Sequence, residues 1–97
     1  MITHVAVFTW VPGVTDEQVA AVEAGLGTLP GRIPTLTSYR FGRDAALSAG
    51  NGDFAVVATF DDVDGWRAYD TDAEHSRIRA ELIKPLIAQR AAIQFES

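Results

Sequence analysis

The sequence contains no cysteine and only two histidines, His4 and His75, among its 97 residues. Without cysteine there is no disulfide framework, no thiolate nucleophile and no cysteine-based zinc site. A calcium loop is not expected either, because the aspartates between Asp61 and Asp64 lack its further spaced ligands and distal glutamate. We therefore expect no metal and no cofactor, and a haem or flavin role would rest on the two histidines alone.

Basic residues and long hydrophobic runs are also scarce. The chain has 8 Lys and Arg against 13 Asp and Glu, and the resulting net charge of −5 opposes binding to nucleic acid. No apolar run approaches the roughly 20 residues that span a bilayer, and no basic leader opens the chain. These absences predict a soluble, cytoplasmic protein that binds neither nucleic acid nor membrane.

What the sequence does contain is the composition of one globular domain, with 47% hydrophobic residues and no linker between residues 1 and 97. Segments rich in β-branched and aromatic residues predict strands over residues 2–10, 35–43, 53–60 and 91–96. Apolar spacing of three and four, after a capping box from Thr15 to Gln18, predicts a helix over residues 16–29. Asp62 is expected to cap a short helix that carries Val63, Trp66 and Tyr69.

After this short helix, a capping box formed by Thr71 and Glu74 predicts the start of a longer helix. Its apolar stripe consists of Ile78, Leu82 and Leu86, and Pro85 should kink or shorten its end. The pair Asn51-Gly52 favours a tight reversal, so the second and third strands should form a hairpin with a long loop.

The order β-α-β-β-α-β predicts an α+β fold of the ferredoxin-like type, with helices on one face of a four-stranded antiparallel sheet. A flat α+β domain with another strand order is the alternative. Side chains alternate between the two faces of a strand, and both faces of the first strand are apolar: Ala6 and Phe8 lie on one face, and Val5 and Val7 lie on the other. Because helices cover only one face, we expect the other to pack on a second copy of the chain as a homodimer.

Four sequence tracts occur in an order and at a spacing that resemble a known family: "HVAVFTWVPGVT", "YRFGRD", "GDFAVVATFDDVDGWRAYDTDAEH" and "LIKPLI". On the basis of these tracts, the chain resembles the stress-responsive dimeric α/β-barrel (Dabb) family over nearly its whole length. This resemblance implies a ferredoxin-like monomer whose sheet pairs with another to close a dimeric α/β barrel. Where the family often shows "HPxH", this chain has "DAEH", with Asp72 in place of the first histidine.

The resemblance also implies candidate site residues. Plant relatives include a polyketide cyclase in which a tyrosine and a histidine act on an enolisable substrate, and these fall on Tyr69 and His75 here. The histidine that opens the first strand of the family falls on His4. We predict Tyr69 and His75 as catalytic, with His4 and Val56 as the floor of a substrate pocket and Ile78 and Leu86 as its wall.

The residues themselves leave two interpretations open. His75 lies in the first turn of the expected helix, three residues before Ile78, where burial and the helix dipole favour the neutral form of a general base. It could equally be a helix-start histidine bonded to backbone or acid, and Tyr69 could be a core tyrosine. His4 could be a hydrogen-bonded core residue of its strand.

Two functions follow from these readings. The first is binding of a small apolar or aromatic molecule, with acid-base catalysis such as cyclisation, lyase or isomerase chemistry that needs no cofactor. The second is a non-catalytic structural or stress-associated homodimer, which predicts no ligand-sized cavity.

Overall fold

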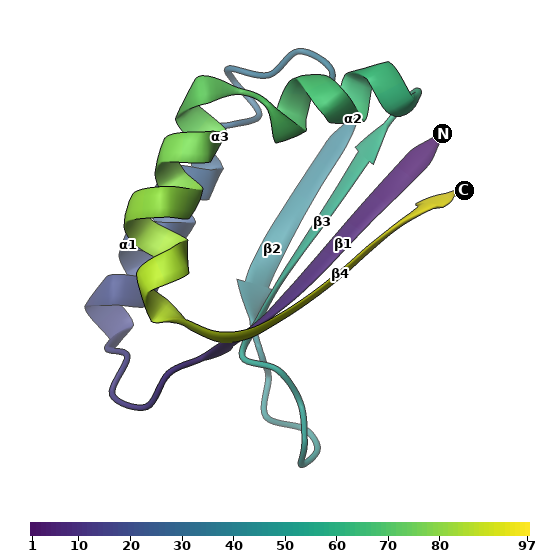
Figure 1. Cartoon of the computed structure of the whole chain (residues 1–97). Helices are drawn as coiled ribbons and strands as arrows, with labels where there is room; N and C mark the ends of the chain where they lie inside the picture. Colours follow the sequence, from purple (N-terminus) through teal and green to yellow (C-terminus); the bar gives the residue numbers. More distant parts are fainter.

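The computed structural model describes all 97 residues and contains one four-stranded antiparallel sheet with every helix on the same face (Figure 1). The elements follow one another as β1 (Ile2–Trp10), α1 (Asp16–Gly27), β2 (Ser38–Arg43), β3 (Phe54–Phe60), α2 (Val63–Asp70), α3 (Ala73–Ile78), η1 (Arg79–Ile83), η2 (Lys84–Leu86) and β4 (Ile87–Glu96). The strand order β2-β3-β1-β4 is that of a ferredoxin-like fold, which confirms the predicted class.

Strand β1 lies between β3 and β4 and supplies the centre of the sheet. Its register places His4 opposite Ala58 of β3 and opposite Gln94 of β4. Because side chains alternate along a strand, His4, Ala6 and Phe8 all point toward the helices, and all three are buried. One side of β1 therefore forms the floor on which the helices rest.

Helix α1 begins as the sequence predicts and ends slightly earlier. The Thr15 side chain accepts from the Gln18 backbone N–H at 3.2 Å, and the Gln18 side chain accepts from the Thr15 backbone N–H at 2.9 Å. The helix ends at Gly27 rather than at residue 29, with Thr28 as its C-cap. Val22 and Leu26 are buried against the sheet, as their spacing indicates.

The start of α3 corrects the second predicted capping box. Thr71 is the C-cap of α2, and its hydroxyl donates to the backbone carbonyl of Arg67, so it cannot cap the next helix. Asp72 caps α3 instead, accepting from the His75 backbone N–H at 2.9 Å. Glu74 pairs with Arg77 rather than reaching back to Thr71. The helix therefore begins one residue later, at Ala73, and His75 still lies in its first turn.

The end of this helical segment is irregular. Helix α3 continues as the π-helical η1, and η2 is a short 3-10 helix that contains Pro85, which has no N–H to continue the helical bonding. Strand β4 then begins at Ile87, earlier than the predicted Ala91. This earlier start brings Arg90 into the sheet, opposite Phe8.

The β2–β3 hairpin has the predicted long loop, but its turn differs in detail. The left-handed residues of the loop are Gly50, with a φ of +83°, and Ala46, with a φ of +58°, and neither belongs to the pair Asn51-Gly52. Gly52 is needed for another reason, since a Cβ atom there would lie 2.5 Å from Cγ1 of Val7. The Asn51 amide bonds the Asp44 carboxylate at 3.0 Å and holds the two arms of the loop together.

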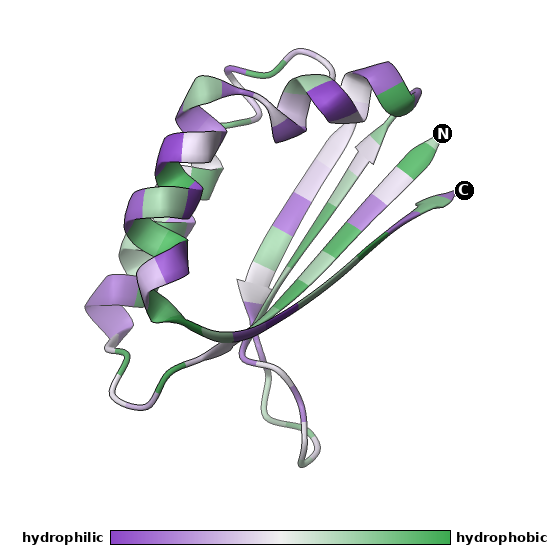
Figure 2. Cartoon of the chain, in the orientation of Figure 1, coloured by the Kyte–Doolittle hydropathy of each residue, from purple (hydrophilic) through white to green (hydrophobic).

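The second face of the sheet is uncovered in the single chain (Figure 1). Figure 2 shows hydrophobic residues along the central strands β1 and β3. On the uncovered face, which we call the open face, Val7, Ile93 and Phe95 are 36%, 59% and 45% exposed. The pairs Val5–Val57 and Val5–Ile93 continue this apolar surface across three strands.

Candidate functional site

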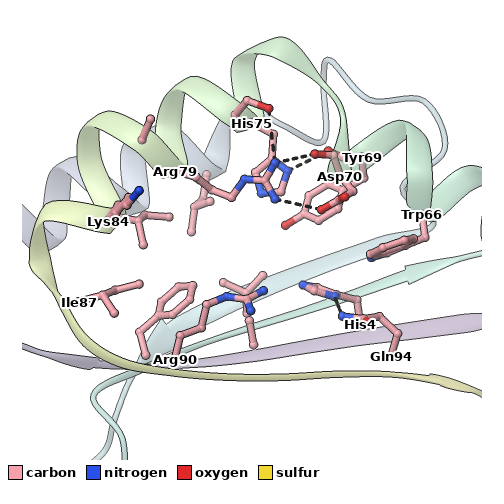
Figure 3. A pocket seen from close by; sticks show the side chains of 17 residues that line it. His4, Trp66, Tyr69, Asp70, His75, Arg79, Lys84, Ile87, Arg90 and Gln94 are labelled. Carbon is pink, nitrogen blue, oxygen red and sulfur yellow. Dashed lines mark hydrogen bonds and ion pairs between the residues drawn. The ribbon is translucent and has the colours of Figure 1, made fainter.

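A cavity of about 360 Å³ lies between the sheet and the helices (Figure 3). Strands β1 and β4 form its floor, and α2, α3 and η1 form its roof. Seventeen residues line it, nine of them hydrophobic. A largely apolar cavity of this volume with a few convergent polar groups is typical of a small-molecule site.

Among the polar groups of the cavity, His75 has the most strongly shifted pKa. Its side chain is 5% exposed, and its Nδ1 lies 2.8 Å from the backbone carbonyl oxygen of Tyr69. Because a carbonyl oxygen can only accept, the proton is on Nδ1 and Nε2 carries the lone pair. Burial lowers the pKa of His75 to about 4, against the weaker opposing effect of the Tyr69 carbonyl. The imidazole is therefore neutral near pH 7.

The Nε2 atom of His75 makes no hydrogen bond within the protein. The one fully buried side-chain nitrogen or oxygen that lacks a partner is Nε1 of Trp66, so Nε2 of His75 keeps accessible surface. His75 also lines the cavity. Its lone pair is therefore available to a molecule bound there, which is the state required of a general base.

Tyr69 lies directly against His75. The two rings stack with their centroids 3.9 Å apart, and the Tyr69 hydroxyl lies 3.0 Å from the hydroxyl of Tyr39 on β2. Burial raises the pKa of the Tyr69 phenol, so it remains protonated at physiological pH. If Tyr39 donates in this pair, the proton of the Tyr69 hydroxyl is free for another acceptor.

His4 faces the same cavity from the sheet. The Gln94 amide nitrogen lies 2.8 Å from Nδ1 of His4 and donates to it, which places the His4 proton on Nε2. Burial, followed by the charge of Arg90, lowers the pKa of His4. The ring contacts the edge of Tyr69 at a centroid distance of 5.8 Å. The two histidines thus have opposite tautomers, His75 with a free lone pair and His4 with an N–H donor.

The cavity also contains one fixed ion pair. Nη1 of Arg79 lies 3.0 Å from the Asp70 carboxylate, and Nη2 donates to the Asp70 backbone carbonyl. Arg79 bridges α2 and η1 in this way and holds the roof of the cavity together. Its positive charge is one of the causes that lower the pKa of His75.

Four of the six predicted site residues, His4, Val56, Tyr69 and His75, line the cavity. The other two, Ile78 and Leu86, lie outside it. Ile78 is fully buried and packs toward α1, where a Cβ atom on Gly25 would touch it at 3.4 Å. Leu86 is buried at the far end of the helical segment. The apolar wall is formed instead by Ile83 and Ile87.

Sequence reasoning missed several lining residues of the cavity, among them its positively charged ones. Arg79 could have been found, because it follows His75 by four residues and so shares its helix face. Arg90 and Gln94 face the cavity through the pairing of β4 with β1, and the predicted fourth strand began one residue too late to include Arg90. Trp66 was placed on the correct helix but was not recognised as part of the site.

Fold and site together define a ferredoxin-like α+β domain with a largely apolar pocket between its sheet and its helices. The chain belongs to the Dabb family, the Stress responsive A/B Barrel Domain, whose family model matches residues 2–97. No curated protein matches the chain.

Solved structures share the fold of this chain. A dimeric ferredoxin-like protein of unknown function from Thermobifida fusca YX is 47% identical, with a TM-score of 0.92 over 99% of this chain and 90% of that one. A dimeric protein of ferredoxin-like fold from Bacteroides fragilis NCTC 9343 is 20% identical, with a TM-score of 0.84 over 99% and 95%. The hydroxynitrile lyase of Passiflora edulis is 15% identical, with a TM-score of 0.83 over 97% and 90%.

Two further observations describe what the molecule does not contain. No group of three or more His, Asp or Glu side chains is placed so that it could hold a metal ion. None of the helices is both long enough and apolar enough to cross a membrane.

Proposed function

We propose that this protein binds a small enolisable carbonyl compound in the cavity and acts on it by acid-base chemistry without a cofactor. The observation that carries the proposal is the state of His75: a buried, neutral imidazole whose proton is fixed on Nδ1 and whose Nε2 lone pair has no partner. A histidine that served only to close the start of α3 would have no need of a cavity beside its free nitrogen.

In the proposed reaction, Nε2 of His75 removes a proton from the carbon next to the substrate carbonyl. The electron pair of that C–H bond forms a C=C bond, and the carbonyl π electrons move to the oxygen to give an enolate. The hydroxyl of Tyr69 and the Nε2–H of His4 donate to this oxygen as its charge develops. If the substrate is β,γ-unsaturated, the enolate is a conjugated dienolate, and the imidazolium returns the proton to its γ carbon, which completes an isomerisation. In an aldol-type reaction the imidazolium instead gives the proton to the alkoxide formed when the enolate carbon attacks a second carbonyl.

Relatives of the same fold lend this proposal limited support. Two solved structures with this fold carry enzyme names, hydroxynitrile lyase and antibiotic biosynthesis monooxygenase, so the fold accommodates catalysis. At 15% and 14% identity they show the fold alone and do not assign a reaction to this chain.

Exchange of carbon-bound hydrogen tests the proposal directly. Aryl ketones such as 2-tetralone are incubated in D₂O with the protein, and deuterium uptake at the carbons beside the carbonyl is followed by NMR. We expect exchange above the buffer rate, and a loss on the order of a hundredfold or more for His75→Asn, since general bases contribute that much. Tyr69→Phe should lower the rate less.

The control for this experiment is Arg67→Gln, which changes an exposed residue of α2 outside the cavity. It should exchange at the wild-type rate. The proposal is wrong if no enolisable ketone exchanges above buffer, or if His75→Asn retains its circular dichroism spectrum and exchanges as fast as the wild type.

Assembly without catalysis is a second candidate, and the apolar open face is the observation that favours it. Val7, Ile93 and Phe95 are exposed on that face, and the neighbours from Thermobifida fusca and Bacteroides fragilis are described as dimeric. A dimer is compatible with either function. The exchange experiment separates them, because a purely structural dimer would show no dependence of exchange on His75.

A further inference from the structure

Only some of the positively charged side chains of this acidic protein form ion pairs. Of its 8 Lys and Arg residues, Arg32, Arg43, Arg77 and Arg79 each pair with a carboxylate within 4.0 Å. Lys84 and Arg90 have no such partner, and both line the cavity together with Arg79. The single carboxylate among the lining residues, Asp70, is already paired with Arg79. The cavity therefore has two uncompensated positive charges in a chain whose net charge is −5.

The position of Arg90 is set by the sheet. It lies on β4 opposite Phe8, whose side chain is buried on the helix side, so Arg90 points to the same side. Figure 3 shows its side chain extending over the floor of the cavity between Ile87 and His4. Its charge reaches His4, where it is the second cause, after burial, of the lowered pKa. Arg90 is thus a partly solvent-exposed charged group whose side chain lines the cavity.

Lys84 approaches from the opposite side. It belongs to η2, and Figure 3 places its ammonium group at the end of the cavity beyond Arg79, away from Trp66. One further donor, the Nε2–H of His4, faces the cavity from the sheet. A ligand that supplied oxygen acceptors and negative charge would complement this arrangement.

We infer that the substrate of this pocket is a monoanion, an apolar or aromatic carbonyl compound that carries a carboxylate, with that carboxylate paired to Arg90 and Lys84 at the rim. The inference rests on the proposed function, since it names the substrate class of the same site. The planar guanidinium of Arg90 matches the two oxygens of a carboxylate, and the apolar majority of the lining suits the rest of the molecule. The carbonyl would then lie near His75 and Tyr69, away from the rim.

A matched pair of ligands isolates the contribution of the ligand's negative charge to binding. The probes are naphthalene-2-carboxylate and naphthalene-2-carboxamide, which have nearly the same shape and differ in charge, and binding is measured by isothermal titration calorimetry. We expect the carboxylate to bind the wild type about fivefold or more tightly than the amide, as for a partly exposed ion pair. The preference should shrink as salt is added. Naphthyl phosphate serves as a third probe.

Variants assign the preference to the cavity. Arg90→Gln should remove most of it and weaken binding of the amide much less than binding of the carboxylate, and Lys84→Gln should remove a smaller part. Arg67→Gln, an exposed arginine of α2 outside the cavity, deletes the same charge and should keep the full preference. This control separates an effect of Arg90 from a change in the net charge of the protein.

The outcomes distinguish this inference from the proposed function. If both probes bind equally, or if Arg90→Gln keeps the preference, the charge inference is overturned, while ketone exchange that depends on His75 would leave the proposed function standing. Tighter binding of the phosphate than of the carboxylate overturns the assignment to carboxylates. If neither naphthalene compound binds, the pocket does not take aromatic anions and the inference fails.

Discussion

At the scale of single residues, the neutral state of His75 has a cost that depends on pH. In the unfolded chain its pKa returns to the ordinary value of 6.5, whereas burial holds it at about 4 in the folded protein. Between these values the unfolded state binds a proton that the folded state does not. The free energy of unfolding should therefore fall as the pH is lowered below 6.5, by about 2 kcal/mol at pH 5.

Urea unfolding between about pH 7.5 and about pH 5 measures this dependence. His75→Asn should flatten the profile, because it removes the titrating group. His4, whose pKa is also lowered, contributes in the same direction, so His4→Asn should flatten the remainder. The charged groups that face these rings are Arg79 and Asp70 for both, and also Arg90 for His4. A profile of equal slope in the wild type and in His75→Asn would show that His75 is not held neutral.

The Tyr39–Tyr69 hydroxyl pair supports a second residue-scale prediction. Each hydroxyl is the partner of the other at 3.0 Å. Changing either residue to phenylalanine should cost about 1 kcal/mol, because it leaves one partly buried hydroxyl without a partner. The double variant should cost less than the sum of the two, with a coupling near 0.5–1 kcal/mol in urea unfolding. Strict additivity would mean that the hydroxyls do not interact.

At the scale of elements, the cap of α3 positions the catalytic candidate. Asp72 accepts from the His75 backbone N–H and also pairs with Arg32 at 3.1 Å. Asp72→Ala should lower the free energy of unfolding by about 1 kcal/mol, the usual cost of losing an N-cap. Asp72→Asn keeps a good cap and loses only the charge, so it should cost less than half as much.

Thermal or urea unfolding of both variants makes the comparison, with Thr71→Ala as the control for the rejected capping box. If Thr71→Ala were as costly as Asp72→Ala, the helix would depend on Thr71 and the assignment of the cap would be wrong. The same variants bear on function, because a frayed first turn would release His75 from the Tyr69 carbonyl.

Much of the fold was predictable at this scale because local signals were strong. The β-branched run of β1 and the reciprocal bonds of Thr15 and Gln18 depend on neighbours in sequence. The errors lie where two elements compete for one residue. Thr71 fits a capping box, yet it already closes α2, and nothing in the local sequence shows that Asp72 is the better placed acceptor.

The site was predictable only in part, for a related reason. Tyr69 and His75 are close in sequence and lie on either side of the junction between α2 and α3, so their proximity follows from local structure. Arg90 meets His4 only because β4 pairs with β1 in one register. The position of the cavity wall likewise depends on how η1 leaves the regular helix, which turns Ile83 rather than Ile78 toward the pocket. Such contacts are tertiary and leave no periodic signal.

At the scale of the whole molecule, the open face predicts how the chain assembles. An apolar surface centred on Val7 and Ile93 spans three strands with no helix over it. We expect a dimer in solution, and Ile93→Lys should convert it to monomer by placing a charge in the buried centre of the interface. Analytical ultracentrifugation over a range of protein concentrations measures the change.

Leu47 provides the control, since it is 89% exposed in the β2–β3 loop and off the sheet. Leu47→Lys makes the same chemical change and should leave the dimer intact. A wild-type protein that sediments as a monomer at every concentration would contradict the prediction, as would a dimer that survives Ile93→Lys.

Trp66 gives the pocket an optical property. The chain has two tryptophans, and only Trp66 lines the cavity, while Trp10 packs against Phe8 and Phe54. Replacing Trp10 by phenylalanine would leave Trp66 as the single tryptophan, in the wall of the site. Because the indole ring of Trp66 lines the cavity, a ligand that packs there should change both the wavelength and the intensity of its emission. The protein thus carries its own reporter, by which a compound library could be screened for binders without any labelled probe.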